Sequence, residues 1–364
     1  MKIPPNHLAK EEVKMKSLLR LLLKSQHQQN RSRPAQTEKG MTLVELLVGA
    51  IMAFLIITPM LGFVVDMLNT DRREQVKSNT EQDIQAATDF IAQDLSQAIY
   101  IYDNIDISGG TRGNVTVTAI RNKLPVGNGG TPILVFWKRQ LQKNAIPLAK
   151  LAQPKGCLEN TVSGTGACND TYVLSLVAYY QVSDGNATWC QPSGGTCPTR
   201  IVRYQIRDGL KDPNKGTVAD PYYTDVKEGQ ERSTAYNPKF DISNPTKDVT
   251  LSPDWGSSEV LVNYIDHSSG PTLTGDECKT ALGNPRTTDS SNVLIGEDTL
   301  KVTDKTTNIN SFYACVDTQR NLARVTIRGN SLRRLQTDAD YDAKKSAFFP
   351  TASVQVQGLG ARGK

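Results

Sequence analysis

One long apolar segment near the N-terminus is the strongest feature of the hydrophobic pattern. The stretch from Leu46 to Val65 contains twenty residues and no charged side chain. As an α-helix it rises about 30 Å, the thickness of the hydrocarbon core of a bilayer. A shorter apolar patch at 18–23 lies in the polar N-terminal segment and is too short to span a bilayer. The pattern predicts one membrane-spanning helix within residues 41–68.

A second helical pattern follows this span directly. Apolar residues recur at steps of three and four positions: Ile84, Ala87, Ile91, Leu95, Ala98 and Tyr102. That spacing draws one apolar stripe along a helix. Since no glycine or proline occurs from residue 63 to 108, we expect the span to continue into an amphipathic helix over 69–103. Pro59 and Gly62 would bend or locally melt it.

Beyond residue 109 the pattern changes to short runs of β-branched and aromatic residues separated by Gly, Pro, Asn and Asp. These runs predict strands over 115–120, 133–137, 172–182, 200–206, 311–316 and 322–328. The pairs 172–182 with 200–206 and 311–316 with 322–328 are expected to form antiparallel hairpins, because each pair is joined by a loop rich in turn residues.

Residues 208–300 have few periodic apolar runs and many Asp, Pro, Asn, Thr and Gly residues. We predict a long loop-rich insertion with one strand over 260–265, and loops of this length are usually functional or mobile. The predicted fold class is α+β, with a long N-terminal helix packed on an antiparallel β-sheet domain of residues 104–350. Residues 351–364 are predicted to be a flexible tail.

Charge is distributed unevenly along the chain. Residues 1–40 contain nine Lys or Arg and three Asp or Glu, which leaves 33 basic and 34 acidic residues in the rest. Basic residues before the span and a nearly neutral body after it place the N-terminus in the cytoplasm and the C-terminal domain outside. The net charge of −1 beyond residue 40 argues against nucleic-acid binding, which needs a concentrated basic surface.

All six cysteines lie C-terminal to the span: Cys157, Cys168, Cys190, Cys197, Cys278 and Cys315. This asymmetry indicates an oxidising compartment, in which disulfides form. Six cysteines allow 15 pairings. The Gly-, Ser- and Thr-rich spacers favour the local pairs Cys157–Cys168 and Cys190–Cys197, which leaves Cys278 with Cys315, but the other pairings stay open.

A short motif lies at the start of the span, in the sequence Lys39-Gly-Met-Thr-Leu-Val-Glu-Leu-Leu47. It resembles the motif of type IV prepilins and pseudopilins, although phenylalanine is commoner than methionine after the glycine and most leaders are shorter. In that family a membrane-embedded prepilin peptidase cuts after the glycine and N-methylates the new first residue. The resemblance implies that residues 1–40 are a cleavable leader, that cleavage falls between Gly40 and Met41, and that Met41 becomes methylated.

Glu45 is the charged residue at the edge of the span. A carboxylate in this position costs on the order of several kcal/mol unless it is paired. The resemblance implies a partner within a filament, the α-ammonium group of a neighbouring subunit's Met41, and this pair would set the axial register of the helices. The alternative is a capping box, in which Thr42 caps the helix and Glu45 reaches back to it. The two roles can coexist.

The run from Leu61 to Gln75, continued by residues 101–103, is similar to the hormogonium polysaccharide secretion pseudopilins of filamentous cyanobacteria. This resemblance implies a pilin-like fold and a non-catalytic minor subunit of a type IV pilus-like or type II secretion-like fibre that supports polysaccharide secretion and gliding motility. The implied partners are the prepilin peptidase, other pseudopilins or pilins, an inner-membrane assembly platform and the exported polysaccharide. The implied location is a single pass through the inner membrane.

The alternative function is a tip-located minor pilin that acts in adhesion or DNA uptake. In that case four aromatic residues of the insertion would stack on sugars or bases: Tyr222, Tyr223, Tyr236 and Trp255. Aromatic residues in loops more often pack onto their own domain.

Enzymatic and metal chemistry find little support in the sequence. Beyond the leader one histidine remains, His267, and there is no G-x-S-x-G, H-E-x-x-H or phosphate-binding glycine loop. His267 is not closely spaced with any cysteine, which disfavours a zinc site. Asp338 and Asp340 are expected on a solvated surface rather than in a glycosidase dyad. The Asp-rich stretch 289–304 lacks the spacing of an EF-hand. We therefore predict no enzyme, no cofactor and no metal.

Overall fold

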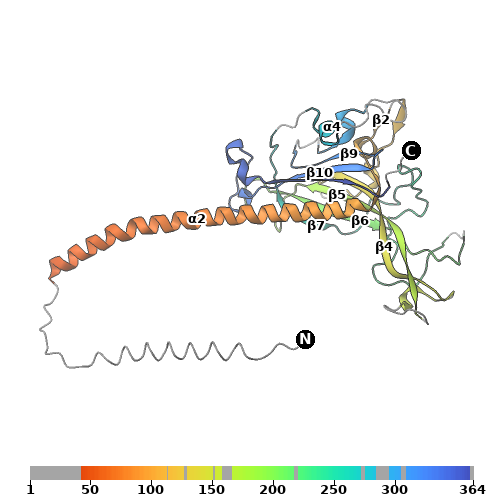
Figure 1. The fold of residues 1–364 in the computed structure, drawn as a ribbon, viewed down its shortest axis with the longest axis horizontal. Coiled ribbons are helices and arrows are strands. Elements are labelled where there is room, and N and C mark those ends of the chain that lie inside the picture. Colours follow the sequence, from red (N-terminus) through yellow and green to blue (C-terminus); the bar gives the residue numbers. More distant parts are fainter. Residues whose placement is uncertain are drawn as a thin grey trace, which may run out of the picture. The chain divides into compact units, whose positions relative to one another are not determined.

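The computed structural model describes residues 42–112, 114–126, 129–150, 152–157, 166–216, 220–271, 275–283, 295–304 and 309–360. The chain forms two compact units, Met1–Met67 and Leu68–Lys364. One helix, α2 (Leu43–Ser96), supplies the described part of the first unit and the beginning of the second (Figure 1). It passes through Pro59 without a break, so the expected local melting of the helix does not occur.

The second half of α2 carries the predicted apolar stripe but ends earlier than predicted. Ile84, Ala87, Ile91 and Leu95 are all buried. The expected helix over 97–103 is wrong, because β1 (Ala98–Ile101) pairs antiparallel with β4 (Thr131–Pro147) instead. The run of β-branched and aromatic residues from 99 to 102 favours a strand, and tertiary pairing decides such short segments.

Five strands form the first sheet, in the order β1-β4-β5-β6-β7. Its other members are β5 (Cys168–Val182), β6 (Thr199–Arg207) and β7 (Glu259–Ile265). The predicted hairpin of β5 with β6 is confirmed, as is the strand over 260–265. β4 is much longer than the predicted 133–137. The prediction was too short because the residues beyond Lys138 are partly exposed and lack a continuous apolar run.

Four strands form the second sheet, in the order β11-β10-β9-β8. They are β8 (Lys301–Val302), β9 (Phe312–Asp317), β10 (Leu322–Arg328) and β11 (Thr351–Gln357). The predicted hairpin of β9 with β10 is confirmed. The prediction of a flexible tail from residue 351 is wrong for β11, because all seven of its residues pair with β10. Its apolar side chains pack against the core: Ala352, Val354 and Val356.

The remaining elements are short. The predicted strand over 115–120 reduces to β3 (Val115–Val117), paired with β2 (Gly110–Arg112), because the chain then turns inward and the N–H of Ile120 donates to the carbonyl of Asp106. The short α-helices are α3 (Asn104–Ser108), α4 (Glu277–Ala281) and α5 (Glu297–Leu300). The 3-10 helices are η1 (Arg121–Lys123), η2 (Pro154–Gly156), η3 (Leu332–Arg334) and η4 (Ala343–Phe348).

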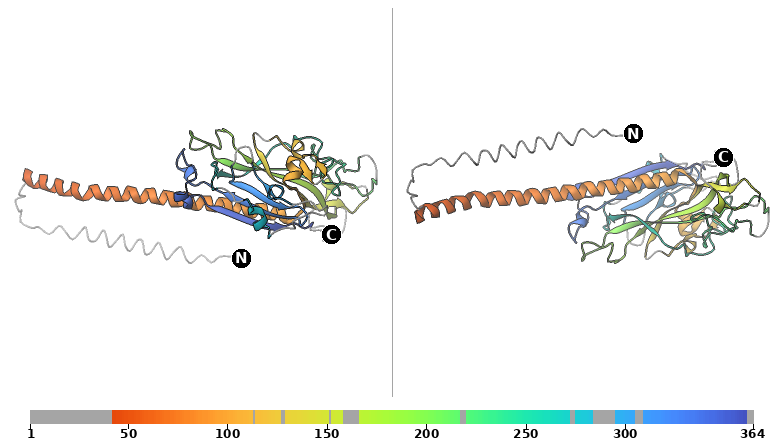
Figure 2. Two further views of the ribbon diagram at one scale, coloured as in Figure 1. Left: turned by 90° about the horizontal axis from the view of Figure 1, so that it is seen from above. Right: turned by 90° about the horizontal axis from the view of Figure 1, so that it is seen from below.

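The first sheet lies between α2 and the insertion. Successive residues of a strand point to opposite faces. On β4, Lys138 bonds Asp94 of α2, whereas the ring of Trp137 stacks on Phe240 of the insertion at 3.8 Å between centroids. The second half of α2 therefore covers one face of the sheet (Figure 2). Residues around 236–249 cover the other face.

Candidate functional site

The first turn of α2 forms the capping box that the sequence offered as an alternative role for Glu45. The N–H and the hydroxyl of Thr42 both donate to Oε2 of Glu45 at 3.2 Å, and the N–H of Glu45 donates to Oγ1 of Thr42 at 3.3 Å. Reciprocal bonds of this kind satisfy donors that have no partner inside the helix. Both Thr42 donors bond Oε2 of Glu45, and no described residue bonds its other carboxylate oxygen, Oε1. Gly40 and Met41 lie outside the described residues.

The first half of α2 is apolar and exposed. Large hydrophobic residues from Leu43 to Leu68 expose between 48% and 84% of their surface. Within the described residues, α2 is the one helix long and apolar enough to cross a membrane. A continuous apolar surface of this kind is unfavourable in water. It is compatible with a single-pass membrane anchor.

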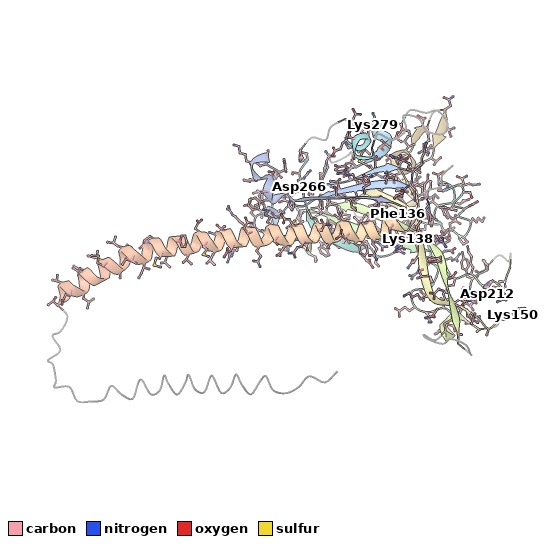
Figure 3. The ribbon with its side chains drawn as sticks, in the orientation of Figure 1. Phe136, Lys138, Lys150, Asp212, Asp266 and Lys279 are labelled. Atoms are coloured by element: carbon pink, nitrogen blue, oxygen red, sulfur yellow. A yellow bond between two sulfur atoms is a disulfide. The ribbon has the colours of Figure 1, made fainter. Side chains whose placement is uncertain are left out.

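The second half of α2 docks through a buried carboxylate that the sequence analysis missed. Oδ1 of Asp94 accepts a bond from Nζ of Lys138 at 2.6 Å. Its Oδ2 accepts bonds from the hydroxyl of Tyr179 at 2.7 Å and from Nε of Arg203 at 2.8 Å. Figure 3 labels Lys138 at the place where α2 meets the sheet.

Electrostatics keep Asp94 charged. Burial raises the pKa of its carboxyl, but the charges of Lys138 and Arg203 and the hydrogen bonds from Lys138 and Tyr179 outweigh burial, so the pKa lies below its usual value. We expect an ion pair placed so deeply to fix the position of the helix on the sheet. The sequence did contain a signal for this buried ion pair, since Asp94 is an ionisable residue that lies within the apolar stripe, three positions after Ile91.

A second buried charge cluster lies just after β1. Nη2 of Arg112 lies 2.6 Å from Oδ2 of Asp103 and 3.3 Å from Oδ1 of Asp106, and the hydroxyl of Tyr100 donates to Oδ2 of Asp106 at 2.8 Å. Burial, reinforced by repulsion from Asp106, raises the pKa of Asp103 to about 6, although Arg112 opposes this shift. Burial also raises the pKa of Asp106. Two carboxylates sharing one guanidinium make this cluster sensitive to pH.

All six cysteines are described and form three disulfides. The pairs are Cys157–Cys168, Cys190–Cys197 and Cys278–Cys315. These are the pairs that the spacers favoured, so that prediction is confirmed. The first two close local loops, while the third joins α4 to β9 across a separation of 37 residues.

The aromatic residues of the insertion belong to the interior of the domain. Tyr222, Tyr223, Tyr236 and Trp255 each expose 8% of their surface or less. A hollow of about 800 Å³ opens beside Tyr222 and is lined by both charged and apolar residues, including Asp212, which Figure 3 labels. The Tyr222 ring lies under the guanidinium of Arg232, with 4.8 Å to the centroid, so one face of the ring is already occupied.

The residues considered for enzyme or metal chemistry are not gathered into a site. Among the described residues, no three His, Cys, Asp or Glu side chains come together in a way that could hold a metal. Asp340 is exposed, and its Oδ1 lies 3.0 Å from Nε2 of His267. Part of the Asp-rich stretch 289–304, residues 289–294, falls outside the described residues. The expected lack of catalysis, cofactor and metal stays a prediction.

Comparisons with models of protein families, with curated proteins and with solved structures found no match to this chain. The class that the fold defines is therefore a coarse one. The chain is an α+β protein in which a long helix, apolar and exposed in its first half, packs through its second half on a disulfide-bonded domain of antiparallel sheets.

Proposed function

We propose that this chain is a pseudopilin, a non-catalytic minor subunit of a type IV pilus-like or type II secretion-like fibre that supports polysaccharide secretion and gliding motility. One observation carries the proposal. One helix begins inside the processing motif, at Leu43, and continues through an uncharged apolar segment into a stripe that docks on a globular domain. Each feature occurs in unrelated proteins, but their order on one helix is typical of pilin-like subunits.

The geometry of Glu45 supports a role in assembly as well as in capping. The cap uses one carboxylate oxygen, so the other can accept a bond from the α-ammonium group of a neighbouring subunit's Met41. Such a pair would form where water is scarce, and a charge in that environment is costly without a partner. The cap and the pair would then act together, since the cap holds the carboxylate at the start of the helix.

The exposed first half of α2 supports both stages of this role. Before assembly its apolar side chains would lie in the inner membrane, with the N-terminus in the cytoplasm and the disulfide-bonded domain outside. In the fibre the same side chains would pack against the helices of other pseudopilins. The prepilin peptidase and an assembly platform would act on the chain at the membrane, and the exported polysaccharide would contact the assembled fibre.

The alternative, a tip subunit acting in adhesion or DNA uptake, has no comparable support. It needed exposed aromatic faces on the insertion, and those side chains are buried. The nearly neutral charge of the body also disfavours binding to DNA.

Leader processing tests the proposal. In cells with the prepilin peptidase, the wild-type chain should lose residues 1–40 and begin at Met41. Gly40→Glu should abolish cleavage, because a bulky charged side chain would have to enter a site that accepts the smallest residue. Gly40→Ala, a small replacement, is the matched control and should still be cut. An immunoblot with mass spectrometry of the N-terminal peptide measures the outcome, and trimming of Gly40→Glu at Met41 would contradict the proposal.

A further inference from the structure

The four outer strands of the two sheets differ in how well they are protected. An outer strand presents unpaired N–H and C=O groups that can template another strand, and proteins usually block such edges with charges, prolines, bulges or very short strands. In this domain the outer strands are β1 and β7 of the first sheet and β8 and β11 of the second.

Three of these edges are blocked. β1 has four residues, its pairing shifts register after Ala98, and the Ala98 carbonyl already accepts bonds from Asn321 and Gly360. β8 has two residues and begins with a lysine. β7 begins with a glutamate, its partner β6 shifts register twice along the pair, and Tyr264 has a φ of 58°. None of the three offers a long, regular row of backbone groups.

β11 has none of these devices. Its seven residues pair with β10 in one unbroken register. The strand Thr351-Ala-Ser-Val-Gln-Val-Gln357 contains no charged residue and no proline. No described strand pairs with its other side. Figure 2 shows this strand, at the blue C-terminal end of the colour scale, running beside the part of α2 that belongs to the domain.

The register also shows which backbone groups of β11 face outward. The N–H of Gly329 donates to the carbonyl of Pro350, and the N–H of Gly358 donates to the carbonyl of Asn321, both at 2.9 Å. Hydrogen-bonded and non-bonded pairs alternate in an antiparallel ladder. Counting from both ends, the even-numbered residues of β11 bond to β10. The odd-numbered residues direct their N–H and C=O groups to the free edge, and all of them are exposed: Thr351, Ser353, Gln355 and Gln357.

We propose that the free edge of β11 is a docking site for an extended segment of a different extracytoplasmic protein, which adds to the sheet as a fifth strand. Main-chain hydrogen bonds would supply the affinity, and alternate side chains the selectivity. Because β11 is uncharged, the segment that fits it is uncharged as well. Small or β-branched apolar residues would lie beside Val354, and polar residues beside Ser353 and Gln355.

A second copy of this chain cannot dock by antiparallel pairing of its own β11 with this edge. Gly329, which bonds Pro350 at the start of β11, lies near Thr80 and Ile84 of α2, while Gly360 after β11 bonds Ala98, so β11 runs in the same direction as α2. Antiparallel pairing of two β11 strands would point the two α2 helices in opposite directions. Two copies anchored in one membrane cannot do this, and that exclusion rests on the proposed function.

The test uses the full chain in the cells that make it, with the photoreactive residue benzoylphenylalanine in place of Thr351. Irradiation should join it to one other protein. Gln355→Pro removes an outward N–H but leaves the ladder to β10 intact, since proline is tolerated where its nitrogen faces away from the sheet. It should lower the adduct about tenfold, whereas Gln355→Ala, which keeps the N–H, should not change it.

Two further readouts make each outcome decisive. If the melting temperature shows that Gln355→Pro is unfolded, Ser353→Pro and Ser353→Ala replace the pair, because Ser353 also faces outward. Equal adducts in the Pro and Ala variants, no adduct, or an adduct with a second copy alone would overturn the proposal. An immunoblot for residues 1–40 on the same samples separates the two proposals. Leader removal without an adduct refutes the docking edge alone, and a proline-sensitive adduct on an unprocessed chain refutes the pseudopilin alone.

Discussion

The two halves of α2 share one continuous helix but differ in what they contact. From Leu43 to Leu68 every large hydrophobic side chain is exposed, and no charge occurs between Glu45 and Asp66. From residue 80 to 95 the helix buries one stripe, together with the carboxylate of Asp94. The second half finds its partners within the same chain, whereas no other part of the chain that the structure describes covers the apolar surface of the first half. A continuous apolar surface of this kind is unfavourable in water and is compatible with a single-pass membrane anchor.

The largest expected effect comes from placing a charge in the buried stripe. Ile91→Asp and Leu95→Asp should each lower the free energy of unfolding of the domain by on the order of 4 kcal/mol, because an unpaired carboxylate replaces a side chain with no exposed surface. Urea unfolding of the detergent-solubilised chain, followed by near-ultraviolet circular dichroism, measures the loss.

Two matched substitutions separate the stripe from the rest of the helix. Gln93→Asp changes an exposed position between the two buried residues and should cost less than about 0.5 kcal/mol. Leu55→Asp places the same charge in the first half, where Leu55 is 62% exposed, and should leave domain stability unchanged while it weakens membrane retention. Equal losses of domain stability at Leu55 and Leu95 would abolish the distinction between the two halves.

Removing the buried carboxylate of Asp94 should have an effect of similar size. Asp94→Ala leaves Lys138 and Arg203 without their shared partner, and breaking a buried ion pair costs about 3–5 kcal/mol. Asp89→Ala, at an exposed position of the same helix where a bond from Gln85 is lost, is the control and should cost under about 0.5 kcal/mol. If both variants melt at the wild-type temperature, the ion pair does not hold α2 on the sheet.

The smallest expected effect is a dependence of the domain's stability on pH, which comes from Asp103. The pKa of Asp103 is raised to about 6 in the folded protein, against about 3.9 for an unfolded aspartate. The folded state therefore binds this proton more tightly, so the contribution to stability is fully present below about pH 3.9 and is lost as pH rises through about 6. We expect the domain to be more stable at pH 5 than at pH 7.5 by about 1 kcal/mol from this group. Urea unfolding at the two pH values measures the difference, and Asp103→Asn should remove it. An unchanged difference in this variant would show that another group causes the pH dependence.

Much of this arrangement was visible in the sequence because it depends on local pattern. The uncharged segment, the stripe from Ile84 to Leu95, both hairpins and the disulfide pairs follow from spacing and from turn residues. The strands β1 and β11 were missed for a common reason. Residues 98–102 match a helical stripe as well as a strand, and 351–357 precede a Gly-containing end, so only long-range pairing with β4 and β10 decides their structure.

The candidate site was predictable to a smaller extent. The capping box between Thr42 and Glu45 follows from their spacing. The environment of Asp94 does not, since Lys138 and Arg203 lie 44 and 109 residues away along the chain. The aromatic residues of the insertion show the same limit, because burial rather than residue type decides whether they can bind a ligand.

The central claim is that Glu45 acts between subunits as well as within its own helix, and one substitution tests it most directly. Glu45→Gln keeps a side chain that can complete the capping box but removes the charge. In a strain that lacks the wild-type copy, the variant should lose its leader and insert into the membrane normally, yet fail to enter the fibre or restore secretion and gliding, because the neighbouring ammonium group has no counter-charge. Membrane fractionation and recovery of sheared fibres separate insertion from assembly. Full assembly of Glu45→Gln would contradict the claim and reduce Glu45 to a helix cap.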